Sequence, residues 1–341
     1  MSLSKAARAT PARVTAVTLV AFALAVAAIV ASLALGVEHV SLSRAFADPG
    51  SLDADILFSA RMPRVFLGAL VGAALSAAGV AFQALLRNPL ADPYVLGVSG
   101  GAAAAGTAAS FVGGVTVLGI WTRPAFAFFG ALGAVAMVYA FGRVRGALVP
   151  HVALLAGVVV NALAGAIILS LRLFLAPFAI ADALAWLTGS LGTVDGLRVG
   201  ALGAYALVAL IVLGWKAVDM NALSLGEDAA RTVGVDVERT RRIIFFAASL
   251  LTAAAVAFAG PIGFVGIVVP HALRRIVGAD HRLLLPASIC GGAAFLVLTD
   301  TASRVAFLAL GTEPAVGILT ALIGAPLFLV ILRRRSGERA L

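Results

Sequence analysis

The stretch KAVDMNALSLGEDAARTVGVDVERTRR, from Lys216 to Arg242, is the most charged part of a chain that is otherwise strongly apolar. It holds ten of the 41 charged side chains, and long apolar runs flank it on both sides. Because charged side chains are costly inside a bilayer, we expect this stretch to lie in water between two membrane spans.

Several residues in this stretch predict a short helix with defined ends. Ser224 and Glu227 have the spacing of a capping box, in which both side chains bind the first free amides of a helix. Gly234 suits the left-handed position that ends a helix, and Asp236 is a typical N-cap for the next one. Apolar side chains recur at every fourth position of this helix: Leu225, Ala229 and Val233. Such a helix is a candidate docking surface for a soluble partner, and a plain solvated connection is the alternative interpretation.

Composition indicates the class of protein. The chain has 341 residues, of which 62% are hydrophobic and 12% charged, whereas soluble domains carry about 25% charged residues. Apolar runs of about 20 residues are long enough to cross a bilayer as helices, so we predict an all-α membrane protein with one transmembrane domain, residues 1–341. Its ten predicted spans are 14–37, 62–86, 94–112, 123–142, 150–172, 197–215, 243–259, 263–277, 282–301 and 314–332.

The distribution of charge predicts the orientation. Ten spans place both termini and residues 216–242 on one side, and 18 of the 25 Lys and Arg residues fall on that side. Asp and Glu divide evenly, so the asymmetry follows the positive-inside rule. We therefore predict that both termini are cytoplasmic, and that the net charge of +9 reflects orientation rather than binding of nucleic acid.

The sequence lacks the motifs of a nucleotide-binding or metal-binding protein. Lysine occurs only at Lys5 and Lys216, outside any G-x-x-x-x-G-K-[ST] motif, so no P-loop is present. If ATP drives this protein, another chain hydrolyses it. The four histidines have no paired ligand spacing, and we predict neither a metal nor another cofactor bound by this chain.

Two irregular stretches follow similar helices. Val-Ala-Phe occurs at 80–82 and again at 256–258, and each copy is followed by a stretch rich in Gly and Pro, 87–97 and 260–266. The predicted spans that carry them run in opposite directions. This pattern is typical of an inverted repeat, whose interrupted helices lie near a transport path.

Two other classes of function remain as alternatives. A carrier coupled to an ion gradient usually needs an ionisable group within the membrane, but no Asp or Glu lies in the middle of a predicted span. An intramembrane serine hydrolase would use Ser99, which lies in a G-x-S-x-G motif, but no strand precedes that serine. We therefore favour neither alternative.

Some polar residues are candidates for binding. Gln83 and Asn161 lie within spans, where they either line a path or form hydrogen bonds between helices. Arg61, Arg64 and Arg304 lie at outer span ends, where we expect exposed cations that bind either lipid headgroups or acidic groups of an extracytoplasmic partner.

Four motifs, in this order, resemble the FecCD permease family over residues 14–335. They are RMPR (61–64), RNPLADPYVLG (87–97), GPIGFVG (260–266) with Pro270-His271, and PAVGILTALIGAP (314–326). The family comprises the membrane subunits of bacterial ABC importers for ferric siderophores, haem and cobalamin.

The resemblance implies specific partners and site residues. It implies ten spans per subunit, a homodimer with a path on the two-fold axis, two ATPase subunits on the inner side, and a periplasmic or lipid-anchored binding protein on the outer side of the bacterial inner membrane. The 216–242 stretch then becomes a cytoplasmic coupling segment, and Arg61, Arg64 and Arg304 contact the binding protein. The turn 143–150 resembles an inner gate, which adds Val149 and Pro150 to Gln83 and Asn161 as candidate path residues. The residues expected to contact the ATPase are Ser224, Leu225, Gly226, Glu227, Ala229, Ala230, Val233 and Gly234.

The sequence therefore predicts a permease subunit without catalytic activity of its own. The resemblance implies import of a metal chelate, which is a ferric siderophore, cobalamin or haem. The absence of a cluster of His, Met or Tyr favours a ferric siderophore or cobalamin over haem.

Overall fold

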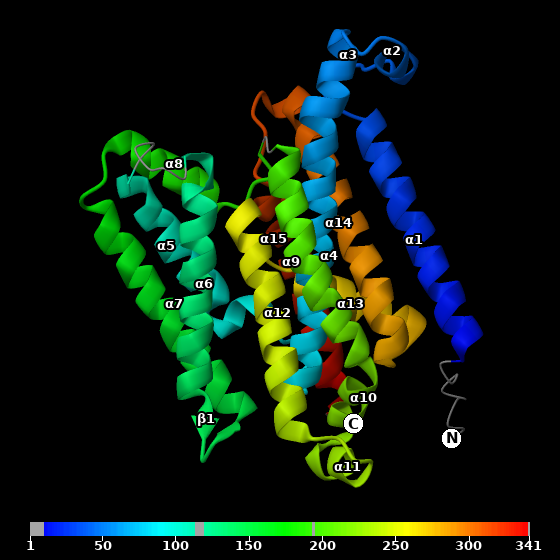
Figure 1. The fold of residues 1–341 in the computed structure, drawn as a ribbon, viewed down its shortest axis with the longest axis vertical. Helices are drawn as coiled ribbons and strands as arrows, with labels where there is room; N and C mark the ends of the chain where they lie inside the picture. The colour runs from blue at the N-terminus through cyan, green and yellow to red at the C-terminus, as the bar shows by residue number, and fades with distance from the viewer. Residues whose placement is uncertain (1–9, 113–118, 193–194, 340–341) are drawn as a thin grey trace.

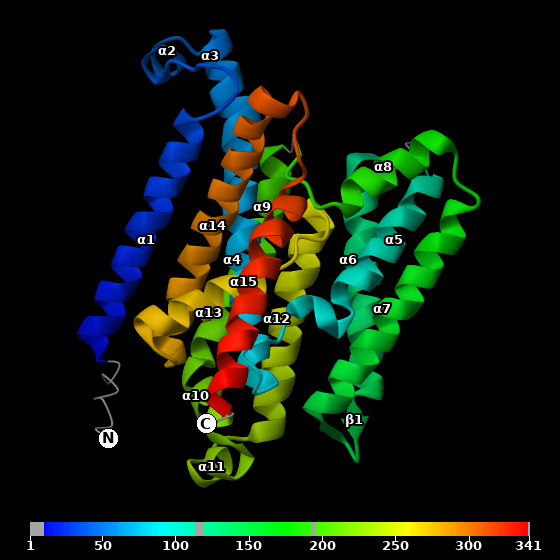
Figure 2. The same cartoon turned by 180° about the vertical axis from the view of Figure 1, so that it is seen from behind.

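A computed structural model describes residues 10–112, 119–192 and 195–339 of the chain as a bundle of helices (Figures 1 and 2). The elements of the first half are α1 (Pro11–Ala34), α2 (Leu42–Ala47), α3 (Leu52–Ala54), the π-helical turn η1 (Asp55–Arg61), α4 (Met62–Leu85), the 3-10 turn η2 (Pro93–Leu96), α5 (Val98–Val112), the 3-10 turn η4 (Gly119–Trp121), α6 (Thr122–Phe141), and strands β1 (Arg143–Val144) and β2 (Ala147–Leu148). The second half contains α7 (Pro150–Arg172), α8 (Pro177–Leu187), α9 (Gly196–Trp215), α10 (Ala217–Leu225), α11 (Glu227–Thr232), α12 (Val237–Ala259), α13 (Val265–Val277), α14 (His281–Leu310) and α15 (Val316–Arg339).

Each of the ten predicted spans coincides with a helix over most of its length. Within the described residues, seven helices are long and apolar enough to cross a membrane: α1, the continuous helix Leu52–Leu85, α6, α7, α9, α12 and α14. The other three predicted spans correspond to α5, α13 and α15, whose apolar parts are shorter. The structure thus confirms a helical membrane protein, and a full crossing by these three helices stays a prediction.

Helix α4 forms the centre of the bundle. In the most apolar 18-residue segment of the continuous helix Leu52–Leu85, which contains α4, 89% of the residues are buried. The corresponding shares are 11% for α1 and 22% for α7. It packs against α14, α12, α13 and α9, and small residues allow this close approach. A Cβ added to Gly72 of α4 would lie 2.1 Å from the carbonyl oxygen of Gly292 in α14, so the two backbones are in direct contact there.

The elements cluster at two ends of the bundle (Figure 1). One end, here called the α11 end, carries α10, α11, the β1–β2 hairpin and the start of α1. The opposite end, here called the α3 end, carries α2, α3 and α8. Helices α5, α6 and α7 form one side of the bundle, and α12 lies between them and α4 in both views.

The one departure from an all-helical chain within the described ranges is the hairpin of β1 and β2. Arg143 pairs with Leu148 and Val144 pairs with Ala147. The two residues between the strands, Arg145 and Gly146, have φ values of 52° and 87°, as a two-residue hairpin turn requires. The hairpin leads directly into α7, at the position where the sequence predicts a gate.

Candidate functional site

The charged stretch folds into two helices, α10 and α11, and the predicted capping box is wrong. Ser224 lies in the last turn of α10, where its hydroxyl donates to the carbonyl of Met220 at 2.8 Å. Helix α11 begins after Gly226 (φ 124°) without a side-chain cap. The reason is that α10 begins at Ala217, and the apolar residues that bury its face continue the helix through Ser224. A serine inside a helix bonds back to an earlier carbonyl instead of capping the next helix.

The other two end signals of this segment are confirmed. Gly234 follows α11 with φ 84°, the left-handed conformation expected just beyond a helix end. The Asp236 side chain accepts a hydrogen bond from the amide of Arg239 at 3.0 Å and so caps α12. Helix α11 is therefore a single short element held between two glycines.

The surface of this segment combines exposed apolar and charged side chains. Leu225 and Val233 are 80% and 70% exposed, and Asp228 is fully exposed between them. Ala229 is half-buried, and Ala230 is buried against the bundle. Two apolar side chains on either side of an acidic turn form a surface that a soluble protein can cover.

Glu227 anchors α11 to the bundle. Its carboxylate accepts a hydrogen bond from Arg87 at 2.9 Å and another from Arg241, and it lies 3.6 Å from Arg231. The Arg241 guanidinium, together with these two arginines, lowers the pKa of Glu227. The carboxylate is therefore ionised at neutral pH, and it joins α11 to the segment that follows α4 and to α12.

Arg241 continues this network toward the hairpin. Its guanidinium also contacts Glu238, one turn earlier in α12, at 3.4 Å. The other carboxylate oxygen of Glu238 accepts a hydrogen bond from the amide of Leu148 in β2 at 3.2 Å. Arg241 is almost completely buried, whereas the two carboxylates that it bridges are about one third exposed.

Helix α10 is fastened to the start of α14. The amide of Asn221 donates to Asp280 at 2.8 Å, and its carbonyl oxygen accepts from the backbone amide of His281 at 2.8 Å. Hydrogen bonds from Arg282 lower the pKa of Asp280 below its usual range. The segment is thus attached to α4, α12 and α14 at the same time.

The two irregular stretches meet in the middle of the bundle. The hydroxyl of Tyr94, in η2, accepts a hydrogen bond from the amide of Ile262. The side-chain amide of Gln83 donates to the carbonyl of Gly266 at 3.3 Å. A Cβ on Gly79 would lie 1.9 Å from the same carbonyl oxygen. Side chains of Tyr94 and Gln83 therefore satisfy backbone groups of the second stretch, as interrupted helices at membrane depth require.

Each predicted path residue lies beside one of these breaks or at the hairpin. Asn161, in α7, donates to the carbonyl of Tyr94 at 2.9 Å. Gln83 also accepts from Arg274 at 2.7 Å. Val149 precedes α7 and Pro150 is its first residue, and both are half-buried. Hydrogen bonding between elements, the simpler interpretation of Gln83 and Asn161, is present for both.

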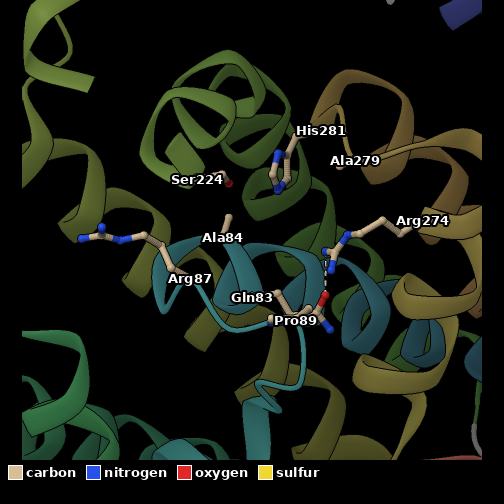
Figure 3. A pocket seen from close by; sticks show the side chains of 8 residues that line it. All are labelled: Gln83, Ala84, Arg87, Pro89, Ser224, Arg274, Ala279 and His281. Atoms are coloured by element: carbon tan, nitrogen blue, oxygen red, sulfur yellow. Dashed lines mark hydrogen bonds between the residues drawn. The ribbon is translucent and has the colours of Figure 1, made fainter. Parts of the chain in front are cut away.

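A polar cavity of about 280 Å³ opens beside Gln83 at the α11 end. In Figure 3, Arg274 reaches Gln83, whereas Arg87 extends to the other side of the same helix end. The cavity lies between α4, α10, α13 and the start of α14. Its lining residues are Gln83, Ala84, Arg87, Pro89, Ser224, Arg274, Ala279 and His281.

At the α3 end, the three predicted docking arginines are engaged within the chain. Arg61 and Arg304 are each only 7% exposed, in contrast to the exposure that we expected. Arg61 donates to the carbonyls of Leu33 and Glu38, and Arg304 donates to the carbonyl of Leu35 at 3.1 Å. Since the last carbonyls of a helix lack partners within the helix, these two arginines hold the end of α1 in place.

Arg64 is the most accessible of the three arginines. It pairs with Asp300 at 2.7 Å and with Glu313, and Asp300 also pairs with Arg304 at 3.1 Å. Asp300 is buried, whereas the Glu313 side chain is 39% exposed. The outer surface of this cluster therefore presents Arg64 and Glu313.

Sequence reasoning missed three residues that organise these sites: Tyr94, Arg241 and Asp300. Tyr94 lies in a motif that the sequence singled out, and a tyrosine between two prolines and a Gly-rich run signals a hydrogen-bonding anchor. Asp300 lies near the end of the predicted span 282–301, where the sequence analysis did not single it out. Its two arginine partners, on α4 and one turn later in α14, were the available signal.

Comparison with known proteins identifies the family. The profile of the FecCD transport family matches residues 13–334. The chain belongs to the FecCD transport family. It is 48% identical over 281 residues to the cobalamin import system permease protein BtuC of Halobacterium salinarum, covering 82% of this chain and 74% of that one. It is 36% identical over 293 residues to the hemin transport system permease protein HmuU of Yersinia pestis, covering 84% and 85%.

A solved structure agrees with this assignment. An inward-facing metal-chelate type ABC transporter has a chain that superposes with a TM-score of 0.80 at 31% identity, covering 94% of this chain and 99% of that one. This FecCD member is therefore the permease subunit of an ABC importer and not itself a catalyst. The ion-coupled carrier and the Ser99 hydrolase are excluded as its function.

Proposed function

We propose that the chain forms the membrane path of an ATP-driven importer for a metal chelate, with cobalamin as the first candidate. The observation that carries the choice of cobalamin is the 48% identity to a cobalamin permease over most of this chain. A haem complex is the second candidate, because the hemin permease is 36% identical over a similar length. A ferric siderophore, which the sequence favoured together with cobalamin, is the third.

The α10–α11 segment is the proposed docking site for the ATPase. Three features of the segment support this role: it is charged, it packs against three helices, and it exposes the apolar side chains of Leu225 and Val233. The proposal places the α11 end and both termini in the cytoplasm of a bacterial cell, with 1–341 as one permease domain of ten crossings. The proposed contact residues are those predicted from the sequence, Ser224, Leu225, Gly226, Glu227, Ala229, Ala230, Val233 and Gly234, of which Ala230 is buried.

At the α3 end, we propose that a binding protein contacts Arg64 first. Arg64 and Glu313 form the accessible part of the cluster, and an acidic group of the partner replaces Glu313 as the ion pair of Arg64. Arg61 and Arg304 then take part by holding α1, and they reach the partner only if α1 moves away.

The translocation path is proposed to run along α7 between two copies of the chain. The supporting observation is that α7 leaves most of its apolar surface uncovered, including Leu155, Val159 and Leu163. Asn161 lies on this helix beside η2, and Val149 and Pro150 lie at its start. Two copies that face each other through α7 would enclose a path whose inner end is the hairpin. The inverted repeat predicted from the sequence would relate the two broken stretches within each copy.

Reconstitution tests the proposed function. The chain is co-expressed with its partner ATPase and binding protein, placed in proteoliposomes with ATP inside, and offered radiolabelled cobalamin outside. We expect ATP-dependent accumulation that excess unlabelled cobalamin abolishes and a protonophore does not. Accumulation of haem or a ferric siderophore, but not of cobalamin, would reassign the substrate. Accumulation without ATP would refute the importer mechanism.

A further inference from the structure

The network that starts at α11 does not end at α12. Glu227 contacts Arg241, Arg241 contacts Glu238, and Glu238 contacts the amide of Leu148 in the hairpin. The first contact joins α11 to α12, the second lies within α12, and the third joins α12 to β2. The contacts therefore form a continuous polar connection from the proposed ATPase surface to the residue just before Val149 and Pro150.

We propose that Glu227, Arg241 and Glu238 form a relay that positions the β1–β2 hairpin according to the state of α11. The inference rests on the proposed function for its role in transport, but its structural part can be tested without transport. Arg241 is the centre of the relay, because it is the residue that contacts both carboxylates.

The elements at the two ends of the relay are too short to hold their own positions. A helix of six residues is not stable alone in water, and neither is an isolated hairpin, least of all one with two residues per strand. Helix α11 is fixed by Glu227 and by the buried Ala230. The hairpin is fixed by the Glu238 contact, by the hydrogen bond from Val149 to Gly142 at 3.0 Å, and by the buried side chain of Leu148. Neither α11 nor the hairpin is therefore stiff enough by itself to oppose a displacement of α11.

The centre of the relay is, by contrast, rigid. Arg241 lies in the second turn of α12, which is a continuous helix of 23 residues with 72% of its apolar window buried. A planar guanidinium can bond two carboxylates in one fixed geometry, whereas a lysine ammonium on its flexible stem cannot. Without Glu227 on one side, the guanidinium of Arg241 would be free to turn toward Glu238. This turn would weaken the hydrogen bond from the Leu148 amide to Glu238.

A purely structural role for Glu238 makes a different prediction. Glu238 lies in the first turn of α12, where an acid stabilises a helix by interacting with its N-terminal dipole. In that case the hairpin would respond to changes at Glu238 but not to changes at Glu227, which lies on a separate helix.

A nitroxide label on the hairpin separates these possibilities. The background variant is Cys290→Ser, which removes the single cysteine, and the label is attached through Val144→Cys, an exposed position in β1. The full chain in lipid nanodiscs is then examined by electron paramagnetic resonance. The test variants are Glu238→Ala, Arg241→Lys and Glu227→Gln. The matched control is Asp228→Asn, which removes a fully exposed charge from α11 and lies 3.9 Å from Arg231 only.

We expect Glu238→Ala and Arg241→Lys to raise the mobile fraction of the label at least twofold. Glu227→Gln should give a smaller rise in the same direction, and Asp228→Asn should leave the spectrum unchanged. Arg241→Lys keeps the positive charge, so it reports on the bridge even where Glu238→Ala fails to fold. An unchanged spectrum for Glu227→Gln and Arg241→Lys would overturn the relay, as would an unchanged spectrum for Glu238→Ala.

The second stage uses the complex with the ATPase subunit. Addition of a non-hydrolysable nucleotide should shift the spectrum of the labelled protein whose relay residues are unaltered, and this shift should be lost in Arg241→Lys. Retention of the full shift in Arg241→Lys would overturn the relay as a route of coupling. Failure of cobalamin uptake would refute the proposed substrate and would leave the first-stage result unaffected.

Discussion

The close contact between α4 and α14 makes a quantitative prediction for Gly72→Ala. The new methyl group would lie 2.1 Å from the carbonyl oxygen of Gly292 and 2.8 Å from the Cβ of Leu296. Both obstacles are fixed parts of α14, so the side chain cannot turn away. The helices must separate by about 1 Å, which removes a quarter to a half of the dispersion energy across the gap.

The cost follows from the packing of the leucine beside the glycine. A buried leucine makes about 50 contacts of about 0.15 kcal/mol each, so the separation costs about 2–4 kcal/mol for one such side chain. Leu296 is completely buried and adjoins the site. We therefore expect Gly72→Ala to lower the free energy of unfolding by about 2–4 kcal/mol, a value that also matches the upper range for overpacked cores.

Reversible unfolding of the purified chain from lipid–detergent micelles by SDS, followed by tryptophan fluorescence, measures this loss. The matched control is Gly133→Ala in α6, where an added Cβ would meet nothing within 4 Å. Removing a glycine from a helix interior there should be neutral or stabilise by up to about 1 kcal/mol. If Gly72→Ala and Gly133→Ala unfold at the same SDS fraction, the close approach of α4 and α14 is not present in the folded protein.

Three further predictions concern the polar sites. Tyr94→Phe removes the acceptor of the buried Ile262 amide, which should destabilise the chain by about 1–3 kcal/mol in the same SDS assay. Asp300→Asn leaves Arg64 and Arg304 without their shared carboxylate and should lower the free energy of unfolding by about 3–5 kcal/mol. Glu313→Gln, at an exposed position, should lower it by less than about 1 kcal/mol. Equal losses for the two variants would refute the buried role of Asp300. Because the pKa of Glu227 is lowered from its usual 4.5, its contribution is complete above pH 4.5 and is lost as the pH falls below that value. A fluorophore on α11 should therefore become mobile only below about pH 4.5, and Glu227→Gln should be mobile at all pH values.

Local signals were sufficient where the structure is determined locally. The ten apolar runs each coincide with a helix, and seven of these helices are long and apolar enough to cross a membrane, since a crossing requires a continuous apolar segment. Gly234 and Asp236 were placed correctly because a left-handed turn and an N-cap depend on neighbours within four residues. Ser224 was misplaced for the same reason: its sequence neighbours fit two helices equally well, and packing of α10 decided between them.

Contacts between distant segments were not predictable in this way. Arg64 and Asp300 are 236 positions apart, and Arg87 and Glu227 are 140 apart. From the sequence, Arg61, Arg64 and Arg304 were interpreted as charges at the outer ends of spans, where a charged side chain is ordinarily exposed. The structure buries Arg61 and Arg304 because the carbonyls at the end of α1 need donors, and a sequence without partners in view does not show that need.

The two connections that leave Glu227 reach the same helix. Through Arg241 and Glu238, the first ends at the hairpin that leads into α7. Through Arg87, the second enters the 87–97 stretch, whose Tyr94 carbonyl accepts from Asn161 in α7. Helix α4 is too deeply buried to move without breaking the core, whereas only 22% of the apolar window of α7 is covered. We therefore expect that α4 resists a push on α11 and that the two connections from Glu227 carry it to α7, which is far less buried than α4.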